Sequence, residues 1–325
     1  MNDMPLRSLL FVPGDSEKKL AGVERCGADA VILDLEDSVA PPNKNLARRL
    51  VAEFLAQNPQ SPRTPKLWVR INPLDSGLAL ADLAAVVGFR PDGIMQPKID
   101  GPEDVRRLSH YLDALEAANG IAADTIQVLP VATETAVAPF RLGDFASAGL
   151  TRLIGLTWGA EDLAAAVGAA TNLDASGEWA FTYRMARSLC LLAAHAAGVQ
   201  AIDTLHVDFR NEAGLRAASR AARSEGFSGR IAIHPAQVAA INESFMPSDA
   251  EVAHARRVMA AFTANPEAGT VGLDGKMLDI PHLRQAQQML RQIELYGDPT
   301  VTKAPVAGVD EPGIAAPPQH ETNAL

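Results

Sequence analysis

The chain has 325 residues, a formal net charge of −10 and 47% hydrophobic residues. This size and composition fit one large globular α/β domain with an appendage, and no apolar stretch reaches the ~18 residues that a membrane helix needs. The acidic balance argues against the phosphate backbone of nucleic acid as the main partner, so we expect neither a nucleic-acid nor a membrane partner. The two cysteines, Cys26 and Cys190, lack metal-type spacing, and we expect free thiols in a reducing cytoplasm.

One layout recurs eight times along the chain: a short apolar run, then a polar or charged residue, then a stretch with helical spacing. The predicted strands are residues 8–12, 30–33, 67–71, 93–95, 127–133, 152–156, 201–207 and 230–233. The predicted helices are residues 16–27, 44–56, 78–87, 102–118, 136–148, 178–197 and 212–225. This alternation predicts an α/β fold, a TIM (β/α)8 barrel over residues 1–245. An open doubly wound sheet is the alternative, but it normally has fewer strands, and no G-x-G-x-x-G sequence follows the first run.

The pattern changes after residue 245. Residues 248–262 and 281–296 are predicted helices, and a strand-turn segment at residues 271–279 separates them. We expect this small C-terminal helical appendage, residues 246–297, to pack on the barrel or on a neighbouring subunit, because it is too small for an independent core. Residues 298–325 are rich in proline, alanine and glycine without periodicity, which predicts a flexible tail.

Two carboxylates follow neighbouring strands of the predicted barrel, Glu134 after the fifth and Asp162 after the sixth. Active sites of such barrels lie at the carboxyl ends of the strands, so one cation could contact both groups. Oxygen ligands without a His/Cys cluster suit Mg²⁺ or Mn²⁺ rather than Zn²⁺. The alternative is that both carboxylates cap helices, as Asp162 could do in the segment GAEDL.

Arg70 lies inside an apolar strand, between Val69 and Ile71, and is therefore predicted to point inward. An inward charge is costly unless it is paired. The fork of the guanidinium group fits a carboxylate or an enolate oxygen. A structural ion pair with Glu36 or Asp37 is the alternative, and the two interpretations are compatible.

The second strand ends in three acids, Asp34, Glu36 and Asp37, whose crowding favours perturbed pKa values. Lys98 is a candidate partner for these acids, and a solvated surface position is the alternative. His234 could serve as an acid–base group, but a histidine before proline at a barrel end more often bonds to loop backbone, which we favour.

Pro13 and Gly14 follow the first strand and lead into a predicted helix. Free N–H groups at a helix N-terminus can hold an anion. We therefore include Pro13 and Gly14 among the residues that contact a substrate.

Several segments together resemble the citrate lyase β-subunit-like branch of the HpcH/HpaI aldolase family, and the malyl-CoA and citramalyl-CoA lyases in particular. They are RSLLFVPGD at residues 7–15, GADAVILDLEDSV at 27–39, APPNK at 40–44, VRIN at 69–72, ETA at 134–136, GAEDL at 159–163 and GFSGRIAIHPAQ at 226–237. They span nearly the whole barrel in order. The resemblance implies a Mg²⁺-dependent barrel lyase that cleaves or forms a carbon–carbon bond between an acyl-CoA and a 2-oxo acid.

The resemblance also implies a role for each matching residue. It makes Glu134 and Asp162 the metal ligands, with Glu134 also contacting the substrate. Arg70 becomes the group that neutralises the thioester enolate. Glu36 and Asp37 become part of the network around Arg70 and the metal-bound water.

The segment GKMLD at residues 275–279 resembles a C-terminal motif whose aspartate reaches the active site of a neighbouring subunit. The resemblance thus implies that Asp279 is catalytic and that the protein is a homotrimer or hexamer. Two positions depart from the family pattern, since Ser16 and Gly22 stand where relatives carry basic groups for the CoA phosphates. We assign that role to the nearby Lys18 and Lys19.

Two other functions remain as alternatives. One is a metal-dependent aldolase that acts on free hydroxy-oxo acids without CoA. The other is an accessory β subunit of a citrate lyase-type complex, which binds an acyl carrier partner. Pocket shape decides among glyoxylate, pyruvate and oxaloacetate, which differ by one substituent.

Overall fold

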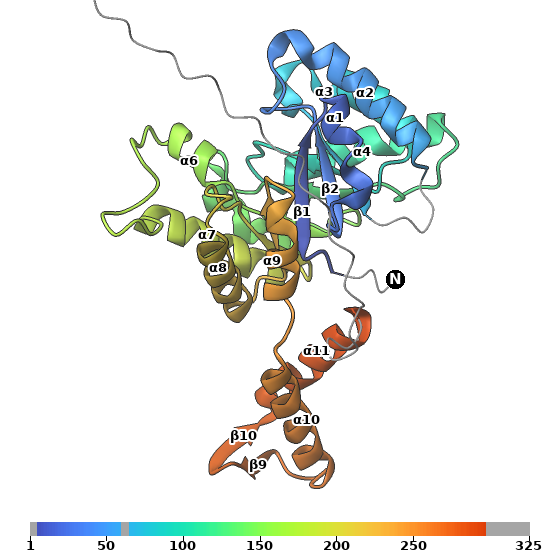
Figure 1. Ribbon diagram of the computed structural model, residues 1–325. Helices are drawn as coiled ribbons and strands as arrows, with labels where there is room; N and C mark the ends of the chain where they lie inside the picture. The colour runs from blue at the N-terminus through green and yellow to red at the C-terminus, as the bar shows by residue number, and fades with distance from the viewer. Residues whose placement is uncertain (1–4, 60–64, 297–325) are drawn as a thin grey trace, which may run out of the picture. The chain divides into compact units, whose positions relative to one another are not determined.

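The structure is a computed structural model and describes residues 5–59 and 65–296 (Figure 1). It divides into two compact units between Met246 and Pro247, one residue from the predicted boundary, and each unit is described by itself. The predicted tail, residues 298–325, lies outside the described residues. Within the described ranges, no helix combines the length and the apolar character that crossing a membrane requires.

Parallel strands form the sheet of the first unit, in the order β5-β4-β3-β2-β1-β8-β7-β6. Their bounds are β1 Ser8–Pro13, β2 Ala30–Asp34, β3 Lys66–Arg70, β4 Gly93–Gln96, β5 Gln127–Pro130, β6 Gly155–Thr157, β7 Gln200–Asp203 and β8 Gly229–Ala232. The two end strands meet through the bridges Val128–Leu153 and Val131–Thr157. The N–H of Ala132 also donates to the Thr157 carbonyl at 2.7 Å. These contacts close the sheet, so the predicted TIM barrel is confirmed.

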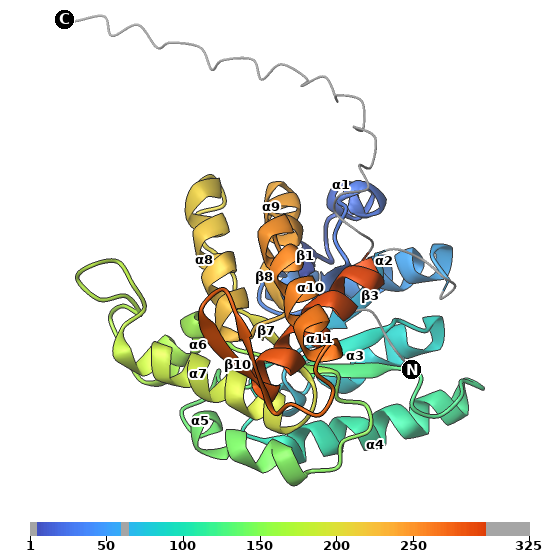
Figure 2. The same ribbon diagram turned by 90° about the horizontal axis from the view of Figure 1, so that it is seen from below.

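Helices connect the strands and surround the barrel (Figure 2). They are α1 Glu17–Leu20, α2 Lys44–Gln57, α3 Ala79–Val86, α4 Pro102–Ala118, α5 Ala138–Arg141, α6 Ala160–Ala166, α7 Phe181–Ala196, α8 Glu212–Glu225 and α9 Ala236–Ser244. Short 3₁₀ helices lie at Val23–Arg25, Pro41–Asn43, Leu74–Ser76, Val87–Phe89 and Leu142–Ser147.

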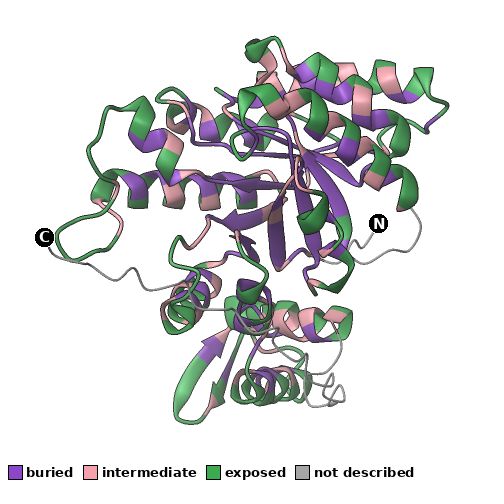
Figure 3. Ribbon diagram, turned by 45° about the horizontal axis from the view of Figure 1, so that its top comes forward, coloured by how far each residue is buried: buried purple, intermediate pink, exposed green. Residues whose placement is uncertain are grey.

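The core has two layers, and the strands between them are buried on both faces (Figure 3). Inside the barrel, Ile32 packs with Leu9 and Ile231. Its neighbours Val31 and Leu33 point the other way and pack in the layer beneath the helices. A strand that is covered on both sides has a continuous apolar sequence, which is why the eight runs could be found.

Several predicted bounds were wrong where apolar residues continue past the end of a strand. Strand β5 ends at Pro130 rather than at residue 133, and β7 ends at Asp203 rather than at residue 207. Residues just beyond both ends, Val131 and Leu205, line a cavity, and Val131 forms only an isolated bridge, so hydrophobicity does not mark where a strand ends. The predicted helices at residues 16–27 and 136–148 each divide into a four-residue α-helix and a 3₁₀ helix.

The second unit comprises α10 Asp249–Thr263, the antiparallel strands β9 Thr270–Leu273 and β10 Lys276–Asp279, and α11 Ile280–Tyr296. Ser248 caps α10 in a capping box with Glu251. Asp274 and Gly275 both have positive φ angles, 52° and 75°, as a two-residue hairpin turn requires. The unit has a core of its own, contrary to our prediction: Ala255, Val258, Phe262, Val271, Leu278 and Ala286.

Candidate active site

The register of the strands determines which side chains meet at the carboxyl end of the barrel. Pro13 pairs with Asp34, Asp34 pairs with Arg70, and Arg70 pairs with Met95. These four residues form one row across β1 to β4. Because neighbouring positions in a row lie side by side, the acid that ends β2 faces the arginine that ends β3.

Arg70 is held by two carboxylates. Its Nε and Nη2 donate to the two oxygens of Asp34 at 2.7 and 2.6 Å, and its Nη1 lies 3.0 Å from Glu36 Oε2. The guanidinium also lies over the ring of Phe11, 4.4 Å from its centroid. The predicted ion pair with Glu36 is therefore present, while Asp37, the other predicted partner, contacts Lys98 instead.

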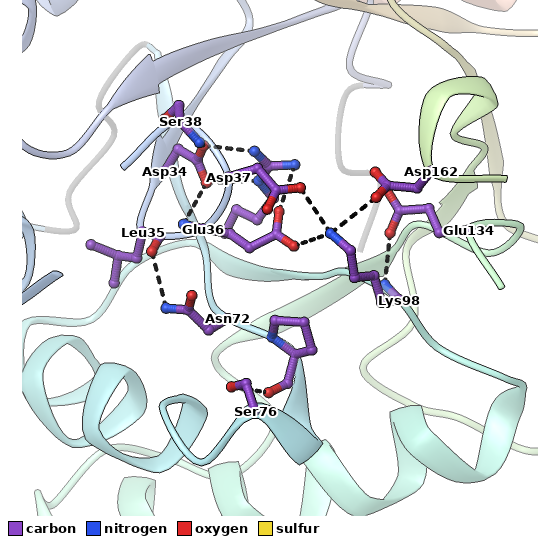
Figure 4. A network of polar contacts seen from close by, with 12 residues as sticks. Asp34, Leu35, Glu36, Asp37, Ser38, Asn72, Ser76, Lys98, Glu134 and Asp162 are labelled. Carbon is purple, nitrogen blue, oxygen red and sulfur yellow. Dashed lines mark hydrogen bonds and ion pairs between the residues drawn. The ribbon is translucent and has the colours of Figure 1, made fainter. Parts of the chain in front are cut away.

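Lys98 links the acids of the second strand to those of the fifth and sixth (Figure 4). Its ammonium group donates to Glu36 and to Asp37, the latter at 2.8 Å, and lies 3.3 Å from Asp162 Oδ1. Its backbone N–H donates to Glu134 Oε2 at 2.7 Å. The backbone has φ 51° at this residue, a conformation that residues other than glycine rarely adopt. The predicted partnership between Lys98 and the acids is thus present.

Glu134 and Asp162 lie on the same side of Lys98 in Figure 4. Asp162 lies in the first turn of α6, and Gly159 is the N-cap, so our alternative that Asp162 caps the helix is wrong. A Cβ on Gly159 would lie 2.9 Å from Glu134 Cγ and 3.0 Å from its Oε1. The absence of a side chain at Gly159 is what allows Glu134 to lie against the turn that carries Asp162.

Burial and neighbouring charges give the acids of the site different pKa values. Burial raises the pKa of Glu134 to about 8, the Asp162 carboxylate adds to the rise, and the nearby Lys98 only partly offsets it. Burial alone would also raise the pKa of Asp34, but hydrogen bonds and charge from Arg70 outweigh it and hold that pKa below its ordinary value. Asp34 is therefore a permanent anion that orients Arg70, whereas Glu134 would need a further cation to favour its charged form.

The donor set at Glu134 and Asp162 fits a hard divalent cation. Two carboxylates supply oxygen ligands, and a cation between them would offset the burial penalty at Glu134. In residues 5–59 and 65–296, no three His, Cys, Asp or Glu side chains are placed to share a metal ion. Mg²⁺ is commonly bound by one or two carboxylates while it keeps several waters, so two protein ligands suffice for it.

A cavity of about 80 Å³ lies beside these groups, and Arg70, Glu134 and Asp162 line it. The rest of its wall is mostly apolar: Phe11, Met95, Val131, Trp158, Trp179 and Ile231. A small pocket with a few convergent charged groups is the usual form of a site for a small polar ligand.

Other predicted residues lie outside this cluster. The N–H of Gly14 donates to the Asp34 carbonyl at 2.9 Å, so this N–H is used within the fold, and contact of Pro13 and Gly14 with a substrate stays a prediction. Lys18 and Lys19 are exposed on α1. Asp279 belongs to the second unit, where its carboxylate pairs with His282.

His234 has the loop role that we favoured. Its Nδ1 accepts a hydrogen bond from the N–H of Ala236 at 3.2 Å, and its ring stacks on Phe209 with 4.6 Å between centroids. These contacts hold the loop after β8.

The sequence did not identify two charged residues that support the site, half-buried Lys44 and buried Asp203. Lys44 donates to the carbonyls of Leu35 and Glu36, both at 2.7 Å, and so holds the loop that carries the acids. Asp203 ends β7 and accepts a hydrogen bond from Trp158 Nε1 at 2.7 Å. The only signal for Lys44 was its place in the segment APPNK, and Asp203 was hidden inside a run that we predicted to continue to residue 207.

Comparisons with known proteins match the whole barrel. The family model HpcH/HpaI aldolase/citrate lyase matches residues 7–235. The mitochondrial citramalyl-CoA lyase of Rattus norvegicus is 34% identical over 297 residues, which cover 88% of this chain and 86% of that protein. Citrate lyase subunit beta of Escherichia coli (strain K12) is 36% identical over 293 residues, covering 90% and 94%.

A solved structure is similar over the same extent. It is protein CitE from Mycobacterium tuberculosis in complex with magnesium, acetoacetate and coenzyme A, with a TM-score of 0.73 and 32% sequence identity. The match covers 89% of this chain and 98% of that chain.

Proposed function

Because this chain belongs to the HpcH/HpaI aldolase/citrate lyase family and is a carbon–carbon lyase, we propose that its substrates are 3-hydroxy-dicarboxylic acyl-CoA esters. Malyl-, methylmalyl- and citramalyl-CoA are the candidates, and the products are an acyl-CoA and a 2-oxo acid. One observation carries the proposal: Arg70, Glu134 and Asp162 line the same small cavity.

Glu134 and Asp162 would hold a Mg²⁺ ion, with Mn²⁺ as the other candidate. The complex of protein CitE with magnesium, acetoacetate and coenzyme A supports this assignment. When bound, the ion supplies Lewis acidity and orientation for the oxygen atoms of the hydroxy or oxo acid. The apolar wall beside these carboxylates excludes water from the same space, which strengthens every charge interaction there.

The chain's own groups account for the transfer of protons and charge. The substrate hydroxyl loses its proton to the network of Glu36 and Asp37, and the C–O bond becomes a carbonyl as the carbon–carbon bond breaks. The electron pair passes to the thioester part, which becomes an enolate. Arg70, fixed by Asp34, faces that developing charge, and preorganised charges of this kind often contribute more to rate enhancement than any other effect.

Asp279 is proposed to complete the reaction by delivering a proton to the enolate carbon from a neighbouring subunit. The proposal rests on the resemblance of residues 275–279 to a C-terminal motif of the malyl-CoA and citramalyl-CoA lyases. It requires an assembly, which we propose to be a homotrimer or hexamer. Lys18 and Lys19, both exposed, are proposed to contact the CoA phosphates.

The experiment is a screen of malyl-, methylmalyl- and citramalyl-CoA with the purified chain, in Mg²⁺ and in EDTA, with detection of the released 2-oxo acid. We expect turnover of at least one ester in Mg²⁺ and loss of turnover in EDTA. Equal rates in Mg²⁺ and EDTA, or cleavage of none of the three esters, would contradict the proposal.

The citrate lyase β subunit remains a second candidate, because the identity to the Escherichia coli subunit is 36%. That function predicts no turnover of free CoA esters by the purified chain and a stable complex with other subunits. Cleavage of an unattached CoA ester by the chain alone would exclude this candidate, and calorimetric binding of CoA would exclude an aldolase that uses free acids only.

A further inference from the structure

Asp203 is a buried carboxylate for which the proposed reaction has no use. It ends β7 and is 2% exposed. Arg230 Nη2 donates to its Oδ2 at 2.6 Å, and Arg187 donates to both of its oxygens at 3.2 and 3.3 Å. The N–H of Thr204 adds a donor at 2.9 Å.

Two guanidinium groups fix this carboxylate from different elements, buried Arg230 from β8 and half-buried Arg187 from α7. Arg187 also pairs with Glu225, and Arg230 donates to the carbonyl of Thr204 at 2.9 Å. Asp203 is therefore a rigid acceptor, and the remaining donor to its Oδ1 is the indole N–H of Trp158, at 2.7 Å.

Trp158 directly precedes the turn that carries Asp162. The next residue, Gly159, donates its N–H to Thr133 Oγ1 at 3.1 Å and lies against Glu134. The start of residues 158–162 is thus tied to β7 through Trp158 and to the segment after β5 through Gly159. The Trp158 ring also lines the cavity and meets Trp179 edge-on, with 5.3 Å between centroids.

We propose that Asp203 is a positioning residue: through its hydrogen bond to Trp158 Nε1 it fixes residues 158–162, and with them the place of Asp162 opposite Glu134 and the aromatic wall of the cavity. The Mg²⁺ part of this inference rests on the proposed function. The ordering of residues 158–162 does not. Partners that orient metal ligands from behind typically contribute 10–100-fold to metal affinity or activity.

Trp158→Phe in the full-length protein removes the indole N–H and keeps an aromatic ring. Trp68→Phe is the matched control, because Trp68 is buried inside the barrel, does not line the cavity, and its indole N–H makes no hydrogen bond to another residue of the described chain. Two measurements apply to each variant: hydrogen exchange of the amides of residues 159–163, and calorimetric titration with Mg²⁺ alone. We expect faster exchange confined to this segment and a ~10-fold or larger rise in the Mg²⁺ Kd for Trp158→Phe, and neither change for Trp68→Phe.

Unchanged exchange at residues 159–163 in Trp158→Phe would overturn the inference, as would a uniform increase across the barrel, which indicates a general loss of stability. If Trp158→Phe does not fold, replacing Trp158 with benzothienylalanine removes the N–H while keeping the shape of the ring, and the same two outcomes apply. Absence of Mg²⁺ binding by the unaltered protein would count against the proposed function and leave the exchange result to decide this inference.

Discussion

Arg70 pairs with a buried carboxylate and also lines the cavity. These two roles determine which substitution tests its chemistry. Arg70→Ala would leave the buried Asp34 carboxylate without its counter-charge, at a cost of about 3–5 kcal/mol in stability. Loss of activity in that variant would therefore mix unfolding with chemistry. Lysine keeps a positive charge near Asp34 but loses the fork that contacts both oxygens.

We predict that Arg70→Lys lowers kcat by ~10²–10³-fold, because one preorganised donor to the developing enolate is lost. Steady-state cleavage of the best acyl-CoA substrate measures the effect, and the thermal midpoint shows whether the fold is retained. Arg106→Lys is the control, since Arg106 pairs with exposed Glu103 on α4. A kcat within the error of the unaltered enzyme would show that Arg70 is a structural residue only.

The identity of the site residues was more predictable than their pairing. Strand ends in a barrel share one rim, so Arg70, Glu134 and Asp162 could be assigned to one cavity from sequence. Which of the three acids at the end of β2 contact Arg70 could not be predicted, because these contacts depend on the register that pairs Asp34 with Arg70. Apolar periodicity gives the face of a strand, but it does not give the alignment between neighbouring strands.

At the scale of elements, the N-terminus of α6 depends on the absence of a side chain at Gly159. The backbone there has φ −121° and ψ 118°, which alanine adopts without strain. We predict that Gly159→Ala weakens Mg²⁺ binding by ~10–100-fold. The added Cβ would lie 2.9 Å from Glu134 Cγ, which is too close, so the Glu134 side chain is displaced. Calorimetry on the purified variant measures the effect.

Gly143→Ala is the matched control for this variant, since a Cβ at that position meets no atom within 4 Å. We expect its Mg²⁺ affinity to equal that of the unaltered protein. Equal affinities in both alanine variants would mean that Glu134 does not need its present position to hold the ion.

Asp203 joins β7, β8 and α7 through its arginine partners, which makes a prediction about the pH dependence of stability. Burial raises the pKa of Asp203, but Arg230 and Arg187 outweigh it, so the pKa lies below its ordinary value. A depressed pKa contributes stability above the unfolded pKa of about 3.9, and this stability is lost as the pH falls through the folded pKa.

We predict that Asp203→Asn lowers the free energy of unfolding by about 3–5 kcal/mol at pH 7, because buried Arg230 loses its counter-charge and Arg187 keeps only Glu225. The deficit should shrink as the pH falls below about 3.9, because the unfolded chain then binds a proton that folded Asp203 does not, until the pH passes the lower folded pKa. Urea unfolding at pH 7 and pH 3 gives both values, with Asp208→Asn in the exposed loop as control. A deficit that is constant with pH would contradict the ionised state of Asp203.

The same elements show where sequence patterns stop being informative. Helices with a covered apolar face, such as α4 and α8, were predicted to within a residue or two. The ends of β5 and β7 were not, because the residues beyond them are apolar for a different reason, namely that they line the cavity. Asp203 was missed for this reason, since it interrupts an apolar run that continues on both sides.

For the whole molecule, the proposed homo-oligomer makes a prediction about which subunit's Asp279 would serve a given barrel. Arg70, Glu134 and Asp162 belong to one compact unit and Asp279 to the other. If Asp279 acts on a neighbouring subunit, a functional site can be assembled from two defective chains. A subunit with Arg70→Lys still offers Asp279, and a subunit with Asp279→Ala still offers an intact Arg70.

We therefore predict that mixing the Arg70→Lys and Asp279→Ala proteins, after subunit exchange, restores cleavage activity that neither variant has alone. Sedimentation measurements on the same mixture would report the oligomer in which exchange occurs. A mixture of Asp279→Ala with Asp279→Asn is the control, because no pairing of those chains supplies the missing carboxylate. Activity equal to the mean of the separate variants, in a mixture shown to exchange subunits, would place Asp279 in the site of its own chain or outside the reaction.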